Sequence, residues 1–227
     1  MGWYHTHMQA AAALDWTAID TVLLDMDGTL LDLRVDNWFW QELVPQRYAE
    51  VNGIGLERAR AILEPKFRAA VGTIQWYCID HWSRELGLNI LDIKRTVLAE
   101  VRYLPGAERF LAKLRLTGKR IVLVTNAHPQ TLAVKSQRIG LQRHFHASYS
   151  THAFATPKED PAFWPRLQAR EPFEPGRTLF VDDSVPVLDS AHRYGIAWLR
   201  AVRCPDSGRP PKDTAGFAAV NHVAELI

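Results

Sequence analysis

A short apolar run leads straight into two carboxylates in the stretch Thr21-Val-Leu-Leu-Asp25-Met-Asp27-Gly28-Thr29-Leu30. A continuous apolar run of this length is typical of a strand in a parallel sheet, which is buried on both faces. The Asp and Gly residues that follow at once favour turns. The stretch therefore predicts a buried parallel strand that delivers Asp25 and Asp27 to a turn at its end.

Two later segments repeat this pattern, Lys119-Arg-Ile-Val-Leu-Val-Thr125 and Arg177-Thr-Leu-Phe-Val-Asp182. Each is followed by a helix-like segment, over residues 129–139 and 184–194 respectively. Strands that alternate with helices require crossover connections, which place the strands parallel in one sheet. We predict an α/β fold with a parallel sheet, to which weaker strands near residues 146–150 and 196–200 also belong.

The stretch between the first two strands has helical rather than strand periodicity. Four apolar residues recur there at helical spacing, namely Trp76, Ile79, Trp82 and Leu86. The stretch is also rich in helix-forming residues. We therefore predict a helical domain over residues 33–103, inserted into a core that comprises residues 1–32 and 104–227.

The composition is that of an ordinary globular protein. The chain has 227 residues, of which 47% are hydrophobic and 23% charged, and its formal net charge is +2. No basic block is long enough to follow a nucleic-acid backbone, so we expect no nucleic-acid partner. No run of about eighteen apolar residues occurs, so we expect no membrane-spanning helix and no membrane partner.

The cysteines and the N-terminus together favour the cytoplasm. Cys78 and Cys204 lie far apart in the sequence, which predicts neither a disulfide framework nor a structural zinc site. Residues 1–14 lack a cationic start followed by a sustained apolar stretch, so they do not resemble an export signal. We expect a cytoplasmic protein, present as a monomer or a homodimer.

Polar residues end each of the three strands, and ligands of open α/β sheets bind at the carboxyl ends of strands. The residues that should converge there are Asp25, Asp27, Thr125, Asn126, Asp182 and Asp183. Four carboxylates in one cleft repel one another unless a cation neutralises them. Because all the ligands would be oxygen atoms, the pattern predicts Mg²⁺ as the cofactor.

In their order along the chain, Asp25-x-Asp27-Gly28-Thr29, Thr125, Lys158 and Asp182-Asp183 resemble the four motifs of haloacid dehalogenase phosphohydrolases. The resemblance implies a Rossmann-like core in which Asp25 attacks phosphorus and Asp27 acts as general acid and base. Dehalogenases of this superfamily lack an aspartate at the position of Asp27. Its presence here favours phosphoryl transfer.

The same resemblance implies roles for the other motif residues. Phosphate would be held by Thr29, Thr125, Asn126 and Lys158, and the metal by Asp25, Asp27, Asp182 and Asp183, with Asp183 the firmer contact. Two features depart from the commonest pattern. No proline directly follows Lys158, and the last motif is an adjacent pair of aspartates rather than two separated acids. Neither departure removes a required charge.

The position of the helical insertion, directly after the first motif, resembles the helical caps of superfamily members that act on small phosphate esters. Its aromatic residues could stack on a base, and Trp38, Trp76 and Tyr77 are candidate substrate contacts. The alternative is that Trp76 belongs to a stripe that packs helices together.

Several strings are similar to the bacterial GMP/IMP nucleotidase branch of this superfamily. They are the segment 21–33, Phe39-Trp-Gln41, Trp76-Tyr-Cys78, Thr125-Asn-Ala-His-Pro129, Pro157-Lys-Glu-Asp160 and Pro205-Asp-Ser-Gly208. The similarity implies that the enzyme hydrolyses purine nucleoside 5′-monophosphates to nucleoside and phosphate. His128 is then a candidate phosphate contact, although a residue that opens a helix before Pro129 explains it equally.

Three alternatives stay open at this stage. The nucleophile and Asp27 would also serve a sugar-phosphate phosphatase or a phosphomutase, which differ from a nucleotidase in what the helical insertion recognises. A non-catalytic phosphate-binding protein belongs to a different class. It is disfavoured because every charged motif residue is present.

Overall fold

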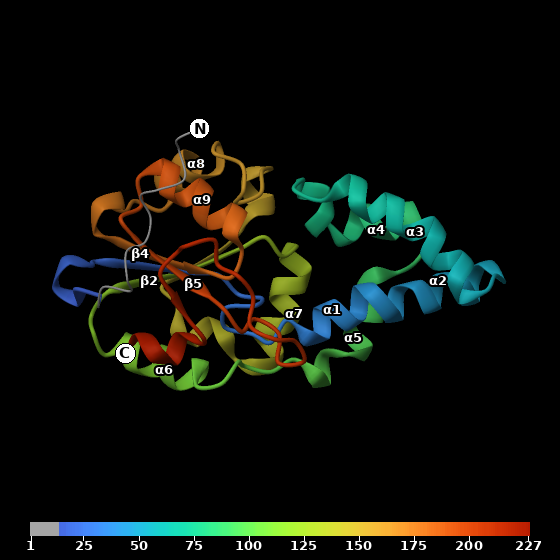
Figure 1. Cartoon of the computed structure of the whole chain (residues 1–227), viewed down its shortest axis with the longest axis horizontal. Coiled ribbons are helices and arrows are strands. Elements are labelled where there is room, and N and C mark those ends of the chain that lie inside the picture. Colours follow the sequence, from blue (N-terminus) through green and yellow to red (C-terminus); the bar gives the residue numbers. More distant parts are fainter. Residues whose placement is uncertain (1–13) are drawn as a thin grey trace.

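The computed structural model describes residues 14–227, so the part of the N-terminus before Leu14, on which the prediction about export depends, lies outside the described residues. Six parallel strands form one sheet in the order β3-β2-β1-β4-β5-β6 (Figure 1). The strands are β1 Thr21–Leu24, β2 Arg120–Thr125, β3 Ala147–Ser150, β4 Thr178–Asp182, β5 Trp198–Val202 and β6 Ala219–Val220. The predicted parallel, Rossmann-like sheet is confirmed, and the short strand β6 was not expected.

Strand β1 is a central strand of the sheet, with a neighbouring strand on each side. It pairs with β2 on one side and β4 on the other. Val22 and Leu24 face one hydrophobic cluster, whereas Leu23 faces a second. Both faces of β1 are therefore buried, which is why its sequence reads as a continuous apolar run.

Helices cover both faces of the sheet. The longer ones are α6 Ala107–Arg115, α7 Pro129–Ile139, α8 Phe163–Arg170 and α9 Val185–Tyr194, with short turns η1 Trp16–Ala18, η5 Leu141–His144, η6 Thr151–Phe154, η7 Pro175–Arg177 and η8 Val223–Leu226. Leu111 of α6 and Leu132 of α7 pack in the cluster that contains Val22. Trp164 of α8 and Leu188 of α9 pack on the opposite face (Figure 1).

A group of helices projects from the end of the sheet to which β1 points (Figure 1). In chain order the elements are α1 Arg34–Trp38, the π-helix η2 Phe39–Leu43, α2 Val44–Asn52, α3 Leu56–Ala70, η3 Ile74–Tyr77, α4 Ile79–Leu86, α5 Ile90–Thr96 and η4 Leu98–Glu100. They share a hydrophobic cluster of their own, which includes Phe39, Leu63 and Trp82. We call residues 33–103 the helical segment.

The two ends of the helical segment lie side by side. The backbone nitrogen of Leu104 donates to the oxygen of Leu30 at 2.8 Å, and that of Asp32 donates to Arg102 at 3.1 Å. Chain entry and exit are thus tied together next to the end of β1. This geometry is what a domain inserted at residues 33–103 requires, and the division itself stays a prediction.

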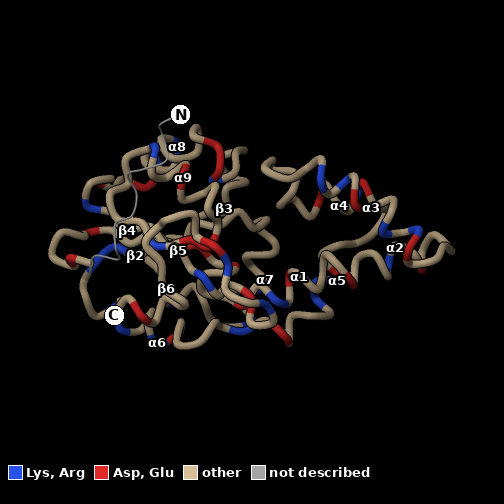
Figure 2. The backbone as a smooth tube through the Cα atoms, in the orientation of Figure 1, with Lys and Arg blue, Asp and Glu red and all other residues tan. Residues whose placement is uncertain are grey.

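Acidic and basic residues alternate along the chain of the helical segment (Figure 2). Arg60 of α3 pairs with Glu42 of η2 at 2.5 Å, and Lys66 of α3 pairs with Glu85 of α4. Such exposed pairs contribute about 1 kcal/mol or less each. The shared apolar cluster is therefore the main stabilisation of this segment. Within residues 14–227, no helix has the length and apolar character needed to cross a membrane.

Candidate active site

Lys158 forms the centre of the site, between two carboxylates at the ends of neighbouring strands. Its Nζ donates to Asp25 Oδ1 at 2.5 Å, to Asp182 Oδ2 at 2.6 Å and to the backbone oxygen of Val124 at 3.1 Å. Only 2% of Lys158 is exposed. Because β2, β1 and β4 are adjacent and parallel, their carboxyl ends bring these groups together although 133 residues separate Lys158 from Asp25.

A trio of carboxylates lies beside this lysine. One oxygen from each of Asp25, Asp182 and Asp183 can be chosen so that all lie within 4.8 Å of one another. Asp25 Oδ2 is buried and has no hydrogen-bond partner among the described residues. Lys212 Nζ donates to Asp183 Oδ2 at 2.8 Å. A set of oxygen donors that includes a buried carboxylate oxygen without a hydrogen-bond partner suits Mg²⁺.

Burial and charge pull the pKa values of these groups in opposite directions. Burial raises the pKa of Asp25 to about 6 and that of Asp182 to about 6, although Lys158 opposes both shifts. Burial by itself would lower the pKa of Lys158, but Asp182 and Asp25 raise it above its ordinary value. Lys158 is therefore a fixed positive charge in the site.

The carboxylate of Asp27 lies outside the trio and is held by a different lysine. Lys135 of α7 donates to Asp27 Oδ1 at 2.6 Å and to Asp36 Oδ2 at 2.6 Å. Lys94 of α5 donates to the other oxygen of Asp36 at 2.8 Å. Burial raises the pKa of Asp27 to about 6, against the opposing effect of Lys135. Asp27 thus belongs to a separate charge network, which it forms with Lys135, Asp36 and Lys94.

Sequence reasoning did not identify Asp36, Lys94 or Lys135 as residues of the site. They lie on three helices, α1, α5 and α7, and they meet only because the helical segment packs against α7. Lys135 is only 3% exposed. Lys135 lies at helical spacing from Leu132 and Ile139, which is a sequence signal for a buried lysine, and a buried lysine requires an anionic partner.

Gly28 allows the turn after β1 to pass close to the end of β4. Its φ is +90°, and a Cβ atom there would lie 2.7 Å from Asp183 Cγ. The next residue, Thr29, is fully buried, and its hydroxyl has no partner among the described residues. The turn therefore needs glycine for both backbone angle and space.

Thr125, the last residue of β2, and Asn126, which follows it, also line the site. Thr125 Oγ1 accepts a hydrogen bond from the backbone nitrogen of Ala127 at 3.0 Å. Asn126 Oδ1 accepts from the backbone nitrogen of Lys158 at 3.0 Å, and its Nδ2 donates to Glu159 at 2.9 Å. Asn126 thereby positions the segment that carries Lys158.

Glu159 also connects the site to the helical segment, a role that the sequence did not reveal. The hydroxyl of Tyr77 donates to Glu159 Oε1. Glu159 itself was visible only as part of the string that contains Lys158. Its partner could not be predicted, because 82 residues separate Tyr77 from Glu159.

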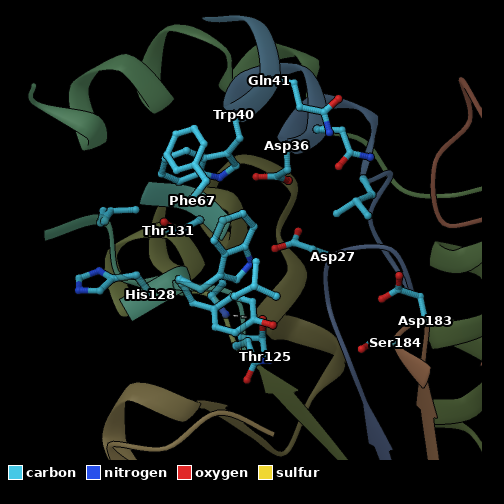
Figure 3. A pocket seen from close by; sticks show the side chains of 18 of the residues that line it. Asp27, Asp36, Trp40, Gln41, Phe67, Thr125, His128, Thr131, Asp183 and Ser184 are labelled. Carbon is cyan, nitrogen blue, oxygen red and sulfur yellow. Dashed lines mark hydrogen bonds between the residues drawn. The ribbon is translucent and has the colours of Figure 1, made fainter. Parts of the chain in front are cut away.

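A cavity of about 640 Å³ lies between the carboxylates and the helical segment. Asp25, Lys158 and Asp183 line one part of it, and Trp40, Phe67 and Trp76 line another. Figure 3 shows the rings of Trp40 and Phe67 to one side of Asp27 and the carboxylate of Asp183 to the other. The cavity therefore has a charged floor and an aromatic wall.

Three of the four predicted substrate residues, Trp76, Tyr77 and His128, line this cavity. Trp38 does not line it and is 45% exposed, whereas Trp40 does. Positions two apart on a helix point in directions about 200° apart, so only one of these residues can face the cavity. The aromatic stripe is also a packing stripe, because Trp82 is buried in the cluster of the helical segment.

His128 has the helix-opening role that the sequence offered as an alternative. Its Nδ1 accepts a hydrogen bond from the backbone nitrogen of Gln130 at 3.3 Å, at the start of α7. Pro129 takes the first position of the helix, where no backbone donor is needed.

Comparison with known proteins gives consistent matches. Residues 19–195 match the family model of haloacid dehalogenase-like hydrolases. The chain is 40% identical over 212 residues to the GMP/IMP nucleotidase YrfG of Escherichia coli (strain K12), covering 93% of this chain and 96% of that protein. It is 24% identical over 212 residues to a phosphoglycolate phosphatase of Mesorhizobium japonicum, covering 90% and 92% of the two chains.

The fold is also similar to that of solved structures. A phosphatase structure from Thermococcus onnurineus superimposes with a TM-score of 0.77 at 20% identity, covering 92% of this chain and 96% of that one. At this identity the likeness concerns the fold alone.

Proposed function

Because this chain belongs to the haloacid dehalogenase-like hydrolases, as its motifs predicted, we propose that it is a Mg²⁺-dependent phosphatase that hydrolyses purine nucleoside 5′-monophosphates. The observation that carries the proposal is the cavity in which Asp25, Lys158 and Asp183 face an aromatic wall. A phosphate group suits the charged end, and a flat base suits the other. The relative named as a GMP/IMP nucleotidase makes GMP and IMP the first candidates.

In the proposed reaction, a carboxylate oxygen of Asp25 attacks phosphorus, and the bond between phosphorus and the 5′-oxygen of the nucleoside breaks. Asp27 gives its proton to the departing oxygen. Asp27 then takes a proton from water, which attacks phosphorus and releases phosphate from Asp25. A pKa of about 6 for Asp27 suits both roles, because the proton can be given and recovered near neutral pH.

Fixed donors would stabilise the negative charge on the phosphoryl oxygens during transfer. Lys158 is the buried cation beside Asp25, and Thr29 has a buried hydroxyl without a partner among residues 14–227. Thr125 and Asn126 complete the proposed phosphate site. Lys158, Thr125 and Asn126 also make structural hydrogen bonds, which would fix their positions before substrate binds.

The metal would be held by Asp25, Asp182 and Asp183, whose oxygens lie together. When bound, Mg²⁺ supplies positive charge that orients the phosphoryl group and offsets its charge in the transition state. Asp27 was also predicted as a ligand. Because its carboxylate accepts a hydrogen bond from Lys135 and lies apart from the other three, we assign Asp27 to proton transfer instead.

We further propose that residues 33–103 act as a cap domain over a core of residues 1–32 and 104–227. Trp40 and Phe67 of this segment line the cavity together with Asp25 of the core. The segment would exclude water and contact the part of the substrate distant from phosphorus.

A panel of phosphate esters tests this function. Phosphate release from GMP, IMP, AMP, a pyrimidine monophosphate and ribose 5-phosphate would be measured with Mg²⁺ and with EDTA. We expect the highest kcat/KM with GMP or IMP and no release with EDTA. If ribose 5-phosphate had the higher kcat/KM, the nucleotidase assignment would fail and a sugar-phosphate phosphatase would replace it. A phosphorylated product without free phosphate would indicate a mutase.

A further inference from the structure

A second group of metal-binding side chains lies apart from the carboxylate trio. One ligand atom each of Cys78, His128 and His152 can be chosen so that all lie within 4.8 Å of one another. Cys78 joins η3 to α4 in the helical segment, His128 precedes α7, and His152 lies in η6 after β3. Three segments that are remote in sequence therefore meet at one point. The reaction proposed above does not use Cys78 or His152.

His152 has an unexplained polar atom at this point. Its Nε2 is buried and has no hydrogen-bond partner among the described residues, whereas its Nδ1 lies 3.3 Å from Ser150 Oγ. Buried polar atoms without a partner are rare and call for a ligand or a strained state. An imidazole nitrogen without a hydrogen-bond partner is free to bind a metal ion in its neutral form.

The other two members of the group are held near His152 by contacts of their own. The rings of His128 and His152 lie edge to face with centroids 4.9 Å apart. His128 Nε2 is 3.4 Å from Asp80 Oδ2, and Cys78 Sγ accepts from the backbone nitrogen of His81 at 3.4 Å. Figure 3 shows the His128 ring on the far side of the cavity from Asp183. The group is thus separate from the proposed Mg²⁺ site.

We propose that Cys78, His128 and His152 form a site for a borderline transition-metal ion, with Zn²⁺ as its best fit. Sulfur and imidazole nitrogen select such ions over Mg²⁺, which prefers oxygen. Ligand atoms around tetrahedral zinc lie roughly 3.3 to 3.8 Å apart. The three atoms lie within 4.8 Å of one another, so they would have to approach by about 1.5 Å or less to reach this spacing. Three protein ligands leave a fourth position for water.

The surroundings determine how tightly this site would bind. The ion would displace the proton of the Cys78 thiol, and His128 would give up its contact with Gln130 or with Asp80. If His128 binds the ion through Nδ1, its Nε2 keeps Asp80 as a partner that orients the imidazole from outside the ligand shell. We therefore expect weaker binding than at four-ligand structural zinc sites. The bound ion would join the helical segment to the loops after β2 and β3.

Cobalt is a suitable probe because a Co²⁺–thiolate bond absorbs in the near ultraviolet, whereas Co²⁺ bound by carboxylates does not. The full chain, freed of metals, would be titrated with Co²⁺ in the presence of Mg²⁺. We expect a thiolate band that saturates at one ion per chain and is displaced by Zn²⁺. Cys78→Ser should abolish the band, and His152→Gln should weaken Co²⁺ binding at least 10-fold. Cys204→Ser is the matched control and should keep the band.

Absence of the band in the unmodified chain, or its persistence in Cys78→Ser, would overturn the proposal. Loss of the band in Cys204→Ser with retention in Cys78→Ser would place the ion elsewhere. Circular dichroism of each variant checks its fold, and His152→Gln supplies the test if Cys78→Ser does not fold. The readout needs no catalytic activity, so it is independent of whether the nucleotidase assignment holds.

Discussion

At the scale of single residues, the charge on Asp25 depends on a balance between burial and Lys158. Burial favours the protonated carboxyl, and the lysine at 2.5 Å favours the ionised form, which is the proposed nucleophile. The balance leaves the pKa at about 6, so most of the group is ionised at neutral pH. Bound Mg²⁺ would favour the ionised form further.

Asp25→Asn tests the nucleophile directly. An amide oxygen is a far poorer nucleophile than a carboxylate, so we expect phosphate release to fall by about 1000-fold or more. The measurement is kcat with saturating GMP and Mg²⁺. Asp20→Asn, just before the same strand, removes an exposed carboxylate that pairs with Arg177 and should leave kcat unchanged. Full activity in Asp25→Asn would show that another group attacks phosphorus.

Gly28→Ala tests the close approach between the turn after β1 and Asp183. The new Cβ would lie 2.7 Å from Asp183 Cγ, and the alanine would have to keep the positive φ of Gly28. We expect a loss of about 1–2 kcal/mol from the backbone angle, together with displacement of Asp183 and weaker Mg²⁺ activation. Gly87→Ala is the matched control, because Gly87 has φ +64° and open space around it. It should lose stability by a similar amount and keep its activity.

At the scale of elements, the turn from α1 into the π-helix η2 decides which tryptophan faces the cavity. Trp40 lies against Phe67 and Trp82, with ring centroids 5.9 and 6.1 Å away, and lines the cavity. Trp38, one half-turn earlier, is on the outer side. Both residues are tryptophans, and the direction in which each side chain leaves the helix decides that Trp40 lines the cavity.

Trp40→Ala should lower kcat/KM for GMP about 10-fold, because a stacking surface for the base is lost. Ribose 5-phosphate carries no base, so its kcat/KM should change less than 2-fold. Trp38→Ala is the control and should leave both values unchanged. Equal losses for GMP and ribose 5-phosphate in Trp40→Ala would mean that Trp40 only packs the helices together. Thermal unfolding of each variant separates that structural loss from a loss of binding.

At the scale of the whole molecule, the buried carboxylates connect stability to pH. Asp25, Asp27 and Asp182 each have a pKa of about 6 in the folded chain, against an ordinary value of 3.8. Between these two values the folded state binds more protons than the unfolded state, so raising the pH destabilises it. This contribution is fully favourable below about pH 4 and is lost as the pH rises through about 6.

Mg²⁺ should therefore stabilise the metal-free protein more at pH 7.5 than at pH 5. At pH 7.5 the carboxylates are ionised and can bind the ion, whereas at pH 5 most are protonated. We expect Mg²⁺ to raise Tm by about 2 °C or more at pH 7.5 and by less at pH 5. Calorimetry with EDTA or Mg²⁺ measures this difference. Asp25→Asn should reduce it, and an equal shift at both pH values would place the ion away from these carboxylates.

Strands β1 to β5, the polar residues at the ends of β1, β2 and β4 and the helical character of the inserted stretch could be predicted from the sequence, whereas the short strand β6 could not. Burial on both faces of β1 requires a continuous apolar run, and the turn beside Asp183 requires Gly28. These are local requirements, so each leaves a local signal. The order of the motifs along the chain also carried the family resemblance. The residues that we propose to be catalytic could therefore be identified from the sequence alone.

Only the tertiary structure decided which distant side chains meet. Lys135 reaches Asp27 across 108 residues, Tyr77 reaches Glu159 across 82, and neither pairing has a local signal. The cysteine spacing predicted no structural zinc site, yet packing brings Cys78 close to two histidines. The physical reason is that periodicity and propensity depend on neighbours along the chain. Contacts of this kind depend on how the helical segment packs against the ends of the strands.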